Sequence, residues 1–400
     1  MRRQALIATS IWFLALFTAT DGFQLGFWPW VMSFNQWDTR WYGTIAMSGH
    51  GFLPQSFVFP PGHSWILGAM TDLTYYAFRS FGIFIKWMMV FSLYGLLLNT
   101  LAFGLSNWIL VSLSEKRWGL SGWRMWLITF SNPMGYFALT AYSDMIFLLL
   151  TLCILLFTLH SSPRAHLWQL ENFLGRISAF SKTAILTLLL ALAPWFRLTG
   201  AAFASLALLR RREVLGTFVG VFGFLLYYWI RTDDPFFFLK AQRVFQMPEG
   251  HFGNGLLYAV SVFLEGFRLD GDSRILARDF GFFLYWVDFG VLPLFVLLLS
   301  FVLTAWLAKR REWELVLILL AITLISHNQA MWRSTVRYAM LIYPLATWMW
   351  LAKDSSLQKL STTTTSLRRA PEILTGLALG FGFAIQIFFA RVFQSGGWAF

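Results

Sequence analysis

The chain alternates long apolar runs with short polar segments. Residues 87–112, 282–308 and 371–390 are apolar over most of their length. Each run has at least the roughly 20 residues that a helix needs to cross about 30 Å of hydrocarbon. Because a lipid interior offers the backbone no water, helices are the expected form of these runs. The pattern predicts an all-α bundle of transmembrane helices.

We place about eleven spans along the chain, and two pairs of them are unusually short. The spans are residues 5–30, 84–112, 124–138, 143–159, 182–197, 199–209, 214–230, 282–308, 313–331, 336–352 and 371–392. The short pairs are 124–138 with 143–159, and 182–197 with 199–209. We expect each pair to enter from the cytoplasmic side, turn in the outer half of the membrane and return. Broken helices of this kind are tolerated where they line a cavity.

The polar stretches between the spans are assigned to the two membrane surfaces. Residues 31–82 and 231–281 are expected as outer-face loop regions that cap one cavity. Residues 353–370, rich in Ser and Thr, are expected as a cytoplasmic linker. The apolar segment after Arg3 lacks a convincing small-residue cleavage site, so we expect it to remain as the first helix. Residues 1–400 are treated as a single membrane domain.

Composition agrees with lipid as the solvent, and charge gives the orientation. Of 400 residues 58% are hydrophobic and 12% are charged, with a mean hydropathy of +0.61. More than half of the 31 Lys and Arg residues fall on one side of the threaded bundle, in clusters such as 210–212 and 309–311. The positive-inside rule assigns that side and the N-terminus to the cytoplasm. The net charge of +12 is therefore attributed to topology, and no nucleic-acid partner is expected.

Cysteine and histidine usage argues against a metal centre. Cys153 is the one cysteine, which leaves no disulfide framework, and the six histidines include no His-x-x-x-His pair. Asp270-Gly271-Asp272 has the spacing that metal-dependent sugar-nucleotide enzymes use, but its glycine favours a turn. We expect no metal and no cofactor.

The first candidate for chemistry follows the first span. Asp38 lies in the segment Gln36-Trp37-Asp38-Thr39-Arg40-Trp41-Tyr42, and Phe59-Pro60-Pro61-Gly62 follows about twenty residues later. Flanking aromatic side chains would partly desolvate Asp38 and make it a stronger general base. The alternative is a helix N-cap with an interfacial Asp–Arg contact.

The second candidate lies at the turn of the first short pair. Ser131-Asn132-Pro133 is followed by Tyr142-Ser143-Asp144. Asn132 before a proline is expected to break the helix, and Asp144 could cap the returning one. Capping alone would explain these residues.

Arginines supply the third and fourth candidates. Arg197 lies in an otherwise apolar stretch, so it needs an anion, either a carboxylate such as Asp38 or Asp144 or a bound phosphate. Arg333 and Arg337 share one helix face on the outer side and could hold a phosphate as a fork, or contact lipid headgroups.

These segments, in this order, resemble the motifs of the PIG-V family. That family supplies the second mannose of glycosylphosphatidylinositol anchors, has bacterial relatives, and belongs to the GT-C class of polytopic glycosyltransferases. The residues that carry the resemblance are Trp37-Asp38, Trp41-Tyr42, Ile45-Ala46, Gly49-His50-Gly51 and Phe59-Pro60, then Asn132-Pro133 with Tyr142-Ser143-Asp144, Arg197-Leu198-Thr199-Gly200, Asp234-Pro235 with Phe238 and Gln242, and Arg337-Tyr338 with Pro344.

The resemblance implies a lipid-linked sugar donor and an inverting transfer. The donor would be a polyprenyl- or dolichyl-phosphate sugar, with mannose as the sugar, used at the outer membrane face without a metal. Asp38 would be the catalytic base. The phosphate-binding residues would be Arg337, Arg197 and Arg333, and the residues that bind or orient substrate would be Trp37, Arg40, Tyr142, Asp144, Gln242 and Tyr338.

Departures from the family pattern limit what is carried over. Asp144 stands where the family usually has glutamate, and His50 and Pro61 vary their motifs. The acceptor is therefore left open, and a bacterial inner membrane is expected ahead of an endoplasmic reticulum membrane. The rival function is a transporter or flippase for a lipid-linked sugar, which would also bury Arg and Asp around a cavity.

Overall fold

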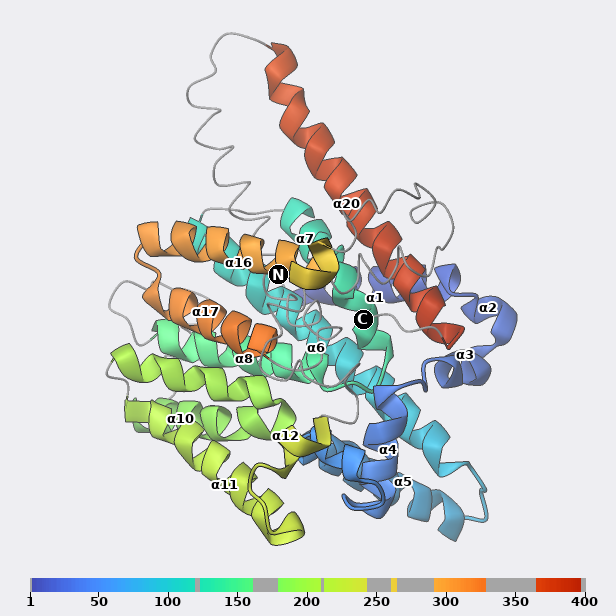
Figure 1. Cartoon of the computed structure of the whole chain (residues 1–400). Coiled ribbons are helices and arrows are strands. Elements are labelled where there is room, and N and C mark those ends of the chain that lie inside the picture. Colours follow the sequence, from blue (N-terminus) through green and yellow to red (C-terminus); the bar gives the residue numbers. More distant parts are fainter. Residues whose placement is uncertain are drawn as a thin grey trace, which may run out of the picture.

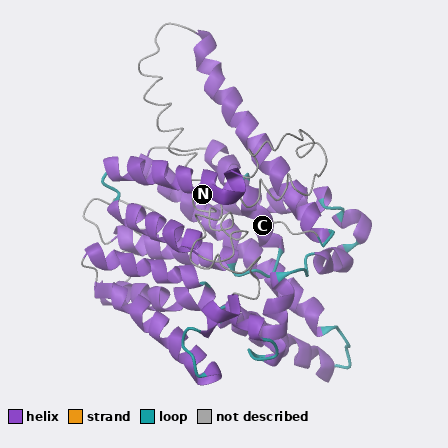
Figure 2. Cartoon of the chain, viewed as in Figure 1, coloured by secondary structure: helices purple, strands orange, loops and turns teal. Residues whose placement is uncertain are grey.

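The computed structural model describes residues 2–118, 123–160, 179–209, 212–242, 260–264, 291–328 and 365–396. Within these ranges the chain forms helices and turns, and no strand occurs (Figure 2). The prediction of an all-α protein is confirmed for the described residues.

Within the described ranges, two helices are long and apolar enough to cross a membrane. One is Trp87–Leu113, within α6 (Trp87–Trp118), and the other is Arg212–Thr232, which includes α11 (Leu215–Thr232). A third span arises if the pair Pro133–Leu139 and Asp144–Thr158, bent by 112°, counts as one. These helices indicate a membrane protein.

Other helices precede and follow α6 in the described chain. Before α6 they are α1 (Arg2–Ala19), α2 (Gly22–Leu25), α3 (Phe27–Ser33), α4 (Asp38–Ser48), η1 (Pro54–Val58) and α5 (Pro61–Ser80). After α6 they are α7 (Trp123–Phe130), η2 (Pro133–Leu139), α8 (Asp144–His160), α10 (Ala179–Phe196), η3 (Leu198–Leu209), η4 (Arg212–Val214), α12 (Phe237–Gln242), α16 (Leu292–Lys309), α17 (Trp313–Asn328) and α20 (Thr365–Gln394).

The helices pack around one large apolar core and two smaller apolar clusters. Helix α8 contacts both α6 and α10, α10 packs on α11, and α17 lies between η3 and α16 (Figure 1). Helices α4 and α5 pack on each other and on α6, while α20 runs past α7 and η2. Figure 1 shows the first half of α20 extending beyond the other described helices. The core includes Leu16, Phe103, Phe137 and Leu303, all with no exposed surface.

Glycines allow two of these contacts to be unusually close. A Cβ on Gly216 or Gly220 would lie 2.1 Å from a carbonyl oxygen of α10. This Gly-x-x-x-Gly spacing lets α10 and α11 approach backbone to backbone, as small residues do between membrane helices. A Cβ on Gly95 would lie 2.2 Å from the Cβ of Ala141, so α6 lies directly against the turn that precedes α8.

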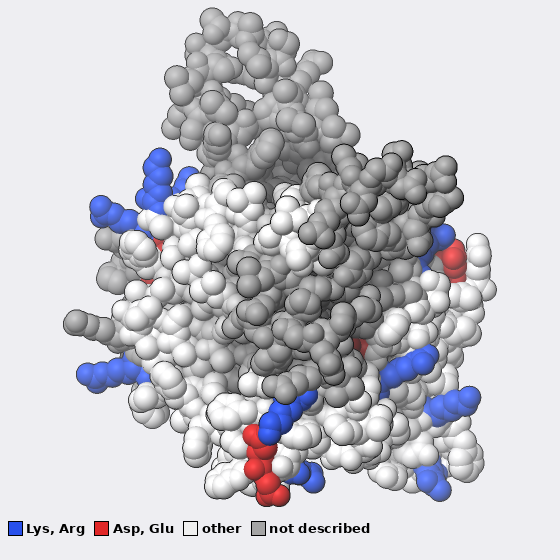
Figure 3. Space-filling view, in the orientation of Figure 1, with Lys and Arg blue, Asp and Glu red and all other residues white. Residues whose placement is uncertain are grey.

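Charged side chains are sparse on the surface that these helices present. On the face drawn in Figure 3, the described Lys, Arg, Asp and Glu side chains lie mostly around the margin, and most of the other described atoms are uncharged. Exposed apolar residues include Leu101 on α6, and Phe222 and Ile230 on α11. Uncharged, apolar exposed area is what a lipid-facing surface requires.

Both predicted helix breaks are confirmed. The first separates α7 from η2 at Ser131 and Asn132, immediately before Pro133. The second falls at Arg197, between α10 and η3. Pro194 lies inside α10, where it removes a backbone donor close to the helix end.

Three predicted boundaries are wrong. The expected helix 5–30 ends at Ala19, because Asp21 adopts a left-handed conformation (φ 61°) and Gly26 a positive φ of 78°. Residues 31–82 are mostly helical, and α5 is 20 residues long with a buried face that its polar composition concealed. Residues 365–370 of the expected linker form the first turns of α20. Residues 336–352 lie outside the described ranges.

Candidate active site

Asp38 begins helix α4 and is held against the turn before α8. Its residue is 8% exposed, and its backbone N–H donates to the Tyr142 hydroxyl at 3.1 Å. The N-cap position belongs to Trp37, which makes no side-chain capping bond, so the N-cap interpretation of Asp38 is wrong. Asp38 is the first residue of the helix itself, where a carboxylate suits the positive end of the helix dipole.

The turn that carries Tyr142 is fixed by side chains from distant helices. Asn99 of α6 donates from Nδ2 to the carbonyls of Thr140 and Tyr142 at 2.6 and 2.7 Å. His63 of α5 bonds from Nε2 to the carbonyl of Ala141 at 2.8 Å. A broken helix inside an apolar protein leaves carbonyls without partners, and these side chains satisfy them.

A second anchor comes from the C-terminal helix. Gln386 of α20 has no exposed surface and donates from Nε2 to the carbonyls of Phe130 and Asn132. Its Oε1 accepts a hydrogen bond from Trp12 Nε1 of α1 at 2.9 Å. One amide therefore ties the break between α7 and η2 to both ends of the chain.

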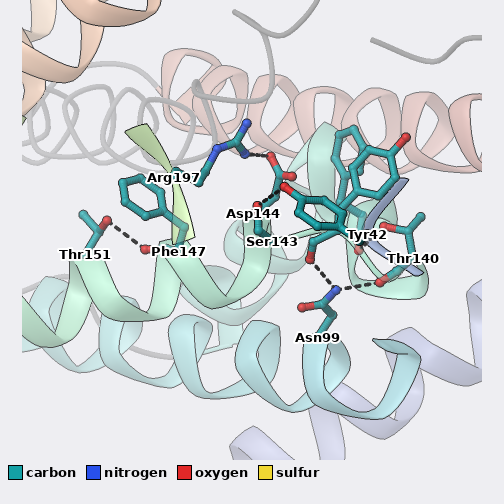
Figure 4. Close-up of polar contacts among 10 residues, drawn as sticks. Tyr42, Asn99, Thr140, Ser143, Asp144, Phe147, Thr151 and Arg197 are labelled. Atoms are coloured by element: carbon teal, nitrogen blue, oxygen red, sulfur yellow. Dashed lines mark hydrogen bonds and ion pairs between the residues drawn. The ribbon is translucent and has the colours of Figure 1, made fainter. Parts of the chain in front are cut away.

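Arg197 and Asp144 form a buried ion pair beside this turn. The Arg197 Nη1 donates to Oδ1 of Asp144, the first residue of α8, and the two side chains are 10% and 2% exposed. Figure 4 shows the two side chains pointing toward each other, with Ser143 and Tyr42 beside Asp144. The anion that Arg197 requires is thus Asp144, and capping alone does not explain Asp144.

Two motif glycines allow these elements to meet at the end of α10. A Cβ on Gly62, at the start of α5, would lie 2.7 Å from the Trp195 carbonyl oxygen. A Cβ on Gly200 would lie 2.4 Å from the Ala193 carbonyl carbon. The segments Phe59–Gly62 and Arg197–Gly200 therefore need glycine for a shared reason, which is close approach to one backbone.

Tyr42 of α4 is buried beside Ser143, the residue before Asp144. Its hydroxyl lies 2.8 Å from the Ser143 Oγ. Burial raises the pKa of Tyr42 above the ordinary value of a phenol, Arg197 acts to lower it, and Asp38 and Asp144 both act to raise it. All three charges thus act on one phenol, which stays protonated at neutral pH.

His63 is a second buried titratable group in the cluster. Burial lowers the pKa of His63 to about 4, against the opposing effect of its bond to the Ala141 carbonyl. The imidazole is therefore neutral at pH 7, and its Nδ1 has no hydrogen-bond partner within the described structure. Its ring packs edge-on to Tyr42, with centroids 5.0 Å apart.

No protein-family model and no curated protein matches this chain. The site is therefore interpreted from its own geometry. Four of the predicted site residues, Asp38, Tyr142, Asp144 and Arg197, meet in one buried cluster.

Of the other predicted site residues, two line a nearby pocket and four have side chains outside the described structure. Trp37 and Arg40 line a pocket on the adjacent face of α4. Gln242 ends α12, and its side chain is outside the description. Arg333, Arg337 and Tyr338, together with Asp270-Gly271-Asp272, lie outside the described residues.

Sequence reasoning missed three buried residues of the cluster: Asn99, His63 and Gln386. Asn99 and Gln386 were visible as amides inside predicted apolar spans, and an amide in such a position needs a polar partner. That signal was present, but the sequence does not say which carbonyls those amides would reach.

Proposed function

We propose that this chain is a polytopic membrane glycosyltransferase of the GT-C type. It transfers a sugar, mannose by the family resemblance, from a polyprenyl- or dolichyl-phosphate donor to an acceptor hydroxyl at the outer membrane face, with inversion. One observation carries the proposal: segments that resemble three family motifs, separated by up to about 160 residues, meet at the turn before α8. There the Asp38 backbone N–H donates to the Tyr142 hydroxyl, and Asp144 pairs with Arg197.

The cluster offers the two functions that such a transfer needs. The donor carries its own leaving group, so the protein must supply a base for the acceptor hydroxyl and positive charge for the phosphate. Asp38 takes the proton of the acceptor hydroxyl as the acceptor oxygen bonds to the anomeric carbon. In the same step the bond between the anomeric carbon and the phosphate oxygen breaks. The lipid phosphate leaves as an anion, which Arg197 stabilises.

Asp144 is assigned a positioning role in this proposal. A guanidinium has five N–H donors, enough to hold a carboxylate and a phosphate oxygen together. The bond from Arg197 to Asp144 fixes the guanidinium plane before substrate arrives. Arg333 and Arg337 are proposed as further phosphate contacts, and Gln242 and Tyr338 as residues that bind or orient the sugar.

The finer topology is part of the same proposal. About eleven spans, a cytoplasmic N-terminus and a bacterial inner membrane would place the cluster toward the periplasm. Cys153 is the chain's one cysteine, so a Cys153→Ala background permits labelling of single introduced cysteines. A membrane-impermeant maleimide added to intact spheroplasts should label Ser80→Cys, at the end of α5, and leave Arg311→Cys, between α16 and α17, unlabelled. The reverse pattern contradicts the orientation.

Transfer itself is tested with the purified protein in lipid nanodiscs. Radiolabelled polyprenyl-phosphate-mannose and a crude acceptor extract are added, with and without a chelator. We expect label in a new glycosidic product, insensitive to chelator, and a decrease of about 10²- to 10⁴-fold in Asp38→Asn. Asp21→Asn is the matched control, because Asp21 is a partly exposed carboxylate outside the cluster.

Two outcomes contradict the proposal. Near-wild-type transfer by Asp38→Asn would show that Asp38 is not the catalytic base. Movement of the labelled lipid across sealed vesicles, without a new glycosidic bond, assigns the protein to the transporter class instead.

A further inference from the structure

The turn between η2 and α8 is bonded by its backbone to two helices and by its side chains to the charged residues. Its three consecutive carbonyls all accept hydrogen bonds from α5 or α6. The Tyr142 hydroxyl accepts the Asp38 N–H, and Asp144 reaches Arg197. Figure 4 shows Asn99 approaching the turn from α6, while Asp144 extends away from Asn99 and toward Arg197. The placement of this backbone therefore sets the positions of both aspartates.

Asn99 bridges the two ends of the turn. Its Nδ2 carries two N–H groups, which reach the carbonyls of Thr140 and Tyr142 at 2.6 and 2.7 Å. An asparagine side chain is short, so the turn must lie close to α6 for both bonds to form. Gly95, one helical turn before Asn99, allows that approach, since a Cβ there would lie 2.2 Å from the Cβ of Ala141. Gly95 and Asn99 together form one seat for the turn.

His63 supplies the third bond, from α5. Its Nε2 lies 2.8 Å from the Ala141 carbonyl oxygen. A carbonyl can only accept, so Nε2 carries the proton and Nδ1 is left as a bare acceptor. That Nδ1 and the Asn99 Oδ1 are both buried without a hydrogen-bond partner in the described structure. An unpaired buried acceptor costs free energy, so stability alone would not favour these two side chains.

We propose that Asn99 and His63 are positioning residues for the transfer. They act through the turn, whose placement sets where Asp38 and Asp144 stand before substrate arrives. This inference rests on the proposed function. Both side chains bond to backbone carbonyls, so they supply neither the proton acceptor nor the positive charge of the reaction. Their effect is geometric, and a displacement of about 1 Å at a reacting group can lower a rate about 10²-fold.

Transfer by Asn99→Leu in lipid nanodiscs tests the proposal. Leucine is similar in size and has no donor for the two carbonyls. Asn107→Leu is the matched control, because Asn107 lies on the same helix, is 1% exposed, and has an Nδ2 without a hydrogen-bond partner in the described structure. We expect kcat to fall about 10²-fold in Asn99→Leu and to stay within about threefold of wild type in Asn107→Leu.

Two variants of His63 test the third bond by rescue. Glutamine keeps a donor for the Ala141 carbonyl, and leucine does not. We expect His63→Gln to transfer within about fivefold of wild type, and His63→Leu to lose about tenfold or more. Equal losses in the two variants would overturn the role of this bond.

A double-mutant cycle separates positioning from a merely structural role. If Asn99 acts through Asp144, its effect should shrink once Asp144 is itself changed. Asn99→Leu should therefore cost less than about fivefold in an Asp144→Asn background, because residues that act as one unit are not additive. A loss through unfolding would instead multiply with the loss from Asp144→Asn, and that result would overturn the proposal.

The Tyr142 ring reports the position of the turn without any transfer. 3-Fluorotyrosine at position 142 should give the same ¹⁹F shift in wild type and Asn107→Leu, and a displaced or broadened signal in Asn99→Leu. An unchanged signal in Asn99→Leu would overturn the positioning role.

The two readouts distinguish this inference from the proposed function. Wild-type protein that makes no glycosidic bond overturns the proposed function, and the role of Asn99 in transfer falls with it. Transfer that wild type performs and Asn99→Leu retains overturns the positioning inference alone.

Discussion

Among the described residues, two Asp–Arg pairs differ mainly in their surroundings. Arg197 and Asp144 meet between α10 and α8, with side chains 10% and 2% exposed. Arg391 and Asp21 meet near the ends of α20 and α1, at 2.9 Å, with side chains 54% and 42% exposed. The two pairs have the same chemical groups, and solvent decides what each contributes.

The exposed pair is one of several polar contacts between α20 and the residues at the end of α1. Arg391 also donates to the Ala19 carbonyl at 2.7 Å, and Gln394 donates to the Thr20 carbonyl at 3.2 Å. Water screens its charges, and an exposed pair contributes between about 0 and 1 kcal/mol. The buried pair must recover a desolvation cost that apolar residues of similar size would avoid. Its retention is therefore better explained by a task than by stability.

Breaking the buried pair should have the largest effect. Arg197→Met leaves Asp144 buried without its partner, and we expect a loss of about 3–5 kcal/mol in the free energy of unfolding. Unfolding by dodecyl sulfate in mixed micelles measures it. The double variant Arg197→Met with Asp144→Leu should recover part of the loss, since it removes both charges. A single-variant loss below 1 kcal/mol would contradict the difference between the two pairs.

Titration of His63 tests the same buried region without removing a contact. Its folded pKa of about 4 lies below the ordinary value of 6.5, so between these values the unfolded chain binds more protons. The contribution of the neutral His63 to the free energy of unfolding is complete above about pH 6.5. It is lost as the pH falls toward 4, by about 3 kcal/mol in all. Unfolding free energies at pH 7 and pH 4.5 measure the loss.

The control for that titration is His63→Gln, which keeps a donor for the Ala141 carbonyl and does not titrate. The variant should lose less stability than the wild type between the two pH values. Parallel losses in both proteins would show that other groups govern the acid response.

Breaking the exposed pair should have the smallest effect. Arg391→Ala is expected to cost about 1 kcal/mol or less, and the cost should shrink as salt is raised from 0.05 to about 0.5 M. The same unfolding assay at two ionic strengths measures it, with Arg79→Ala as an exposed-arginine control on α5. A salt-independent loss of unfolding free energy as large as that of Arg197→Met would contradict the difference between the exposed pair and the buried pair.

Local sequence accounts for the class of the fold and for its breaks. Apolar length predicts helices in lipid wherever it occurs, and Asn132 before Pro133 ends a helix because of the covalent geometry of proline. The second predicted break lies beside Arg197, a charge within an apolar stretch, and α10 ends at Phe196 immediately before it. These properties depend on a few neighbouring residues, and the sequence by itself determines them.

Composition was a poorer guide to where individual helices begin and end. Residues 31–82 appeared polar, yet α4 and α5 form there because each buries one face against α6 and its neighbours. Conversely, the apolar run 5–30 contains Asp21 and Gly26, whose positive φ angles end α1 and reorient the chain. Such outcomes depend on packing that no window of the sequence contains.

The sequence by itself determined which polar groups would need partners, and only the tertiary structure decided which partners they have. Arg197 had two candidate carboxylates and a phosphate as possible anions, and the packing of α10 against α8 brings it to Asp144. Gln386 reaches carbonyls more than 250 residues away in the chain. The free-energy cost of burying a charge or an amide depends on the residue itself. The hydrogen bonds that offset this cost depend on which distant backbone groups lie within reach.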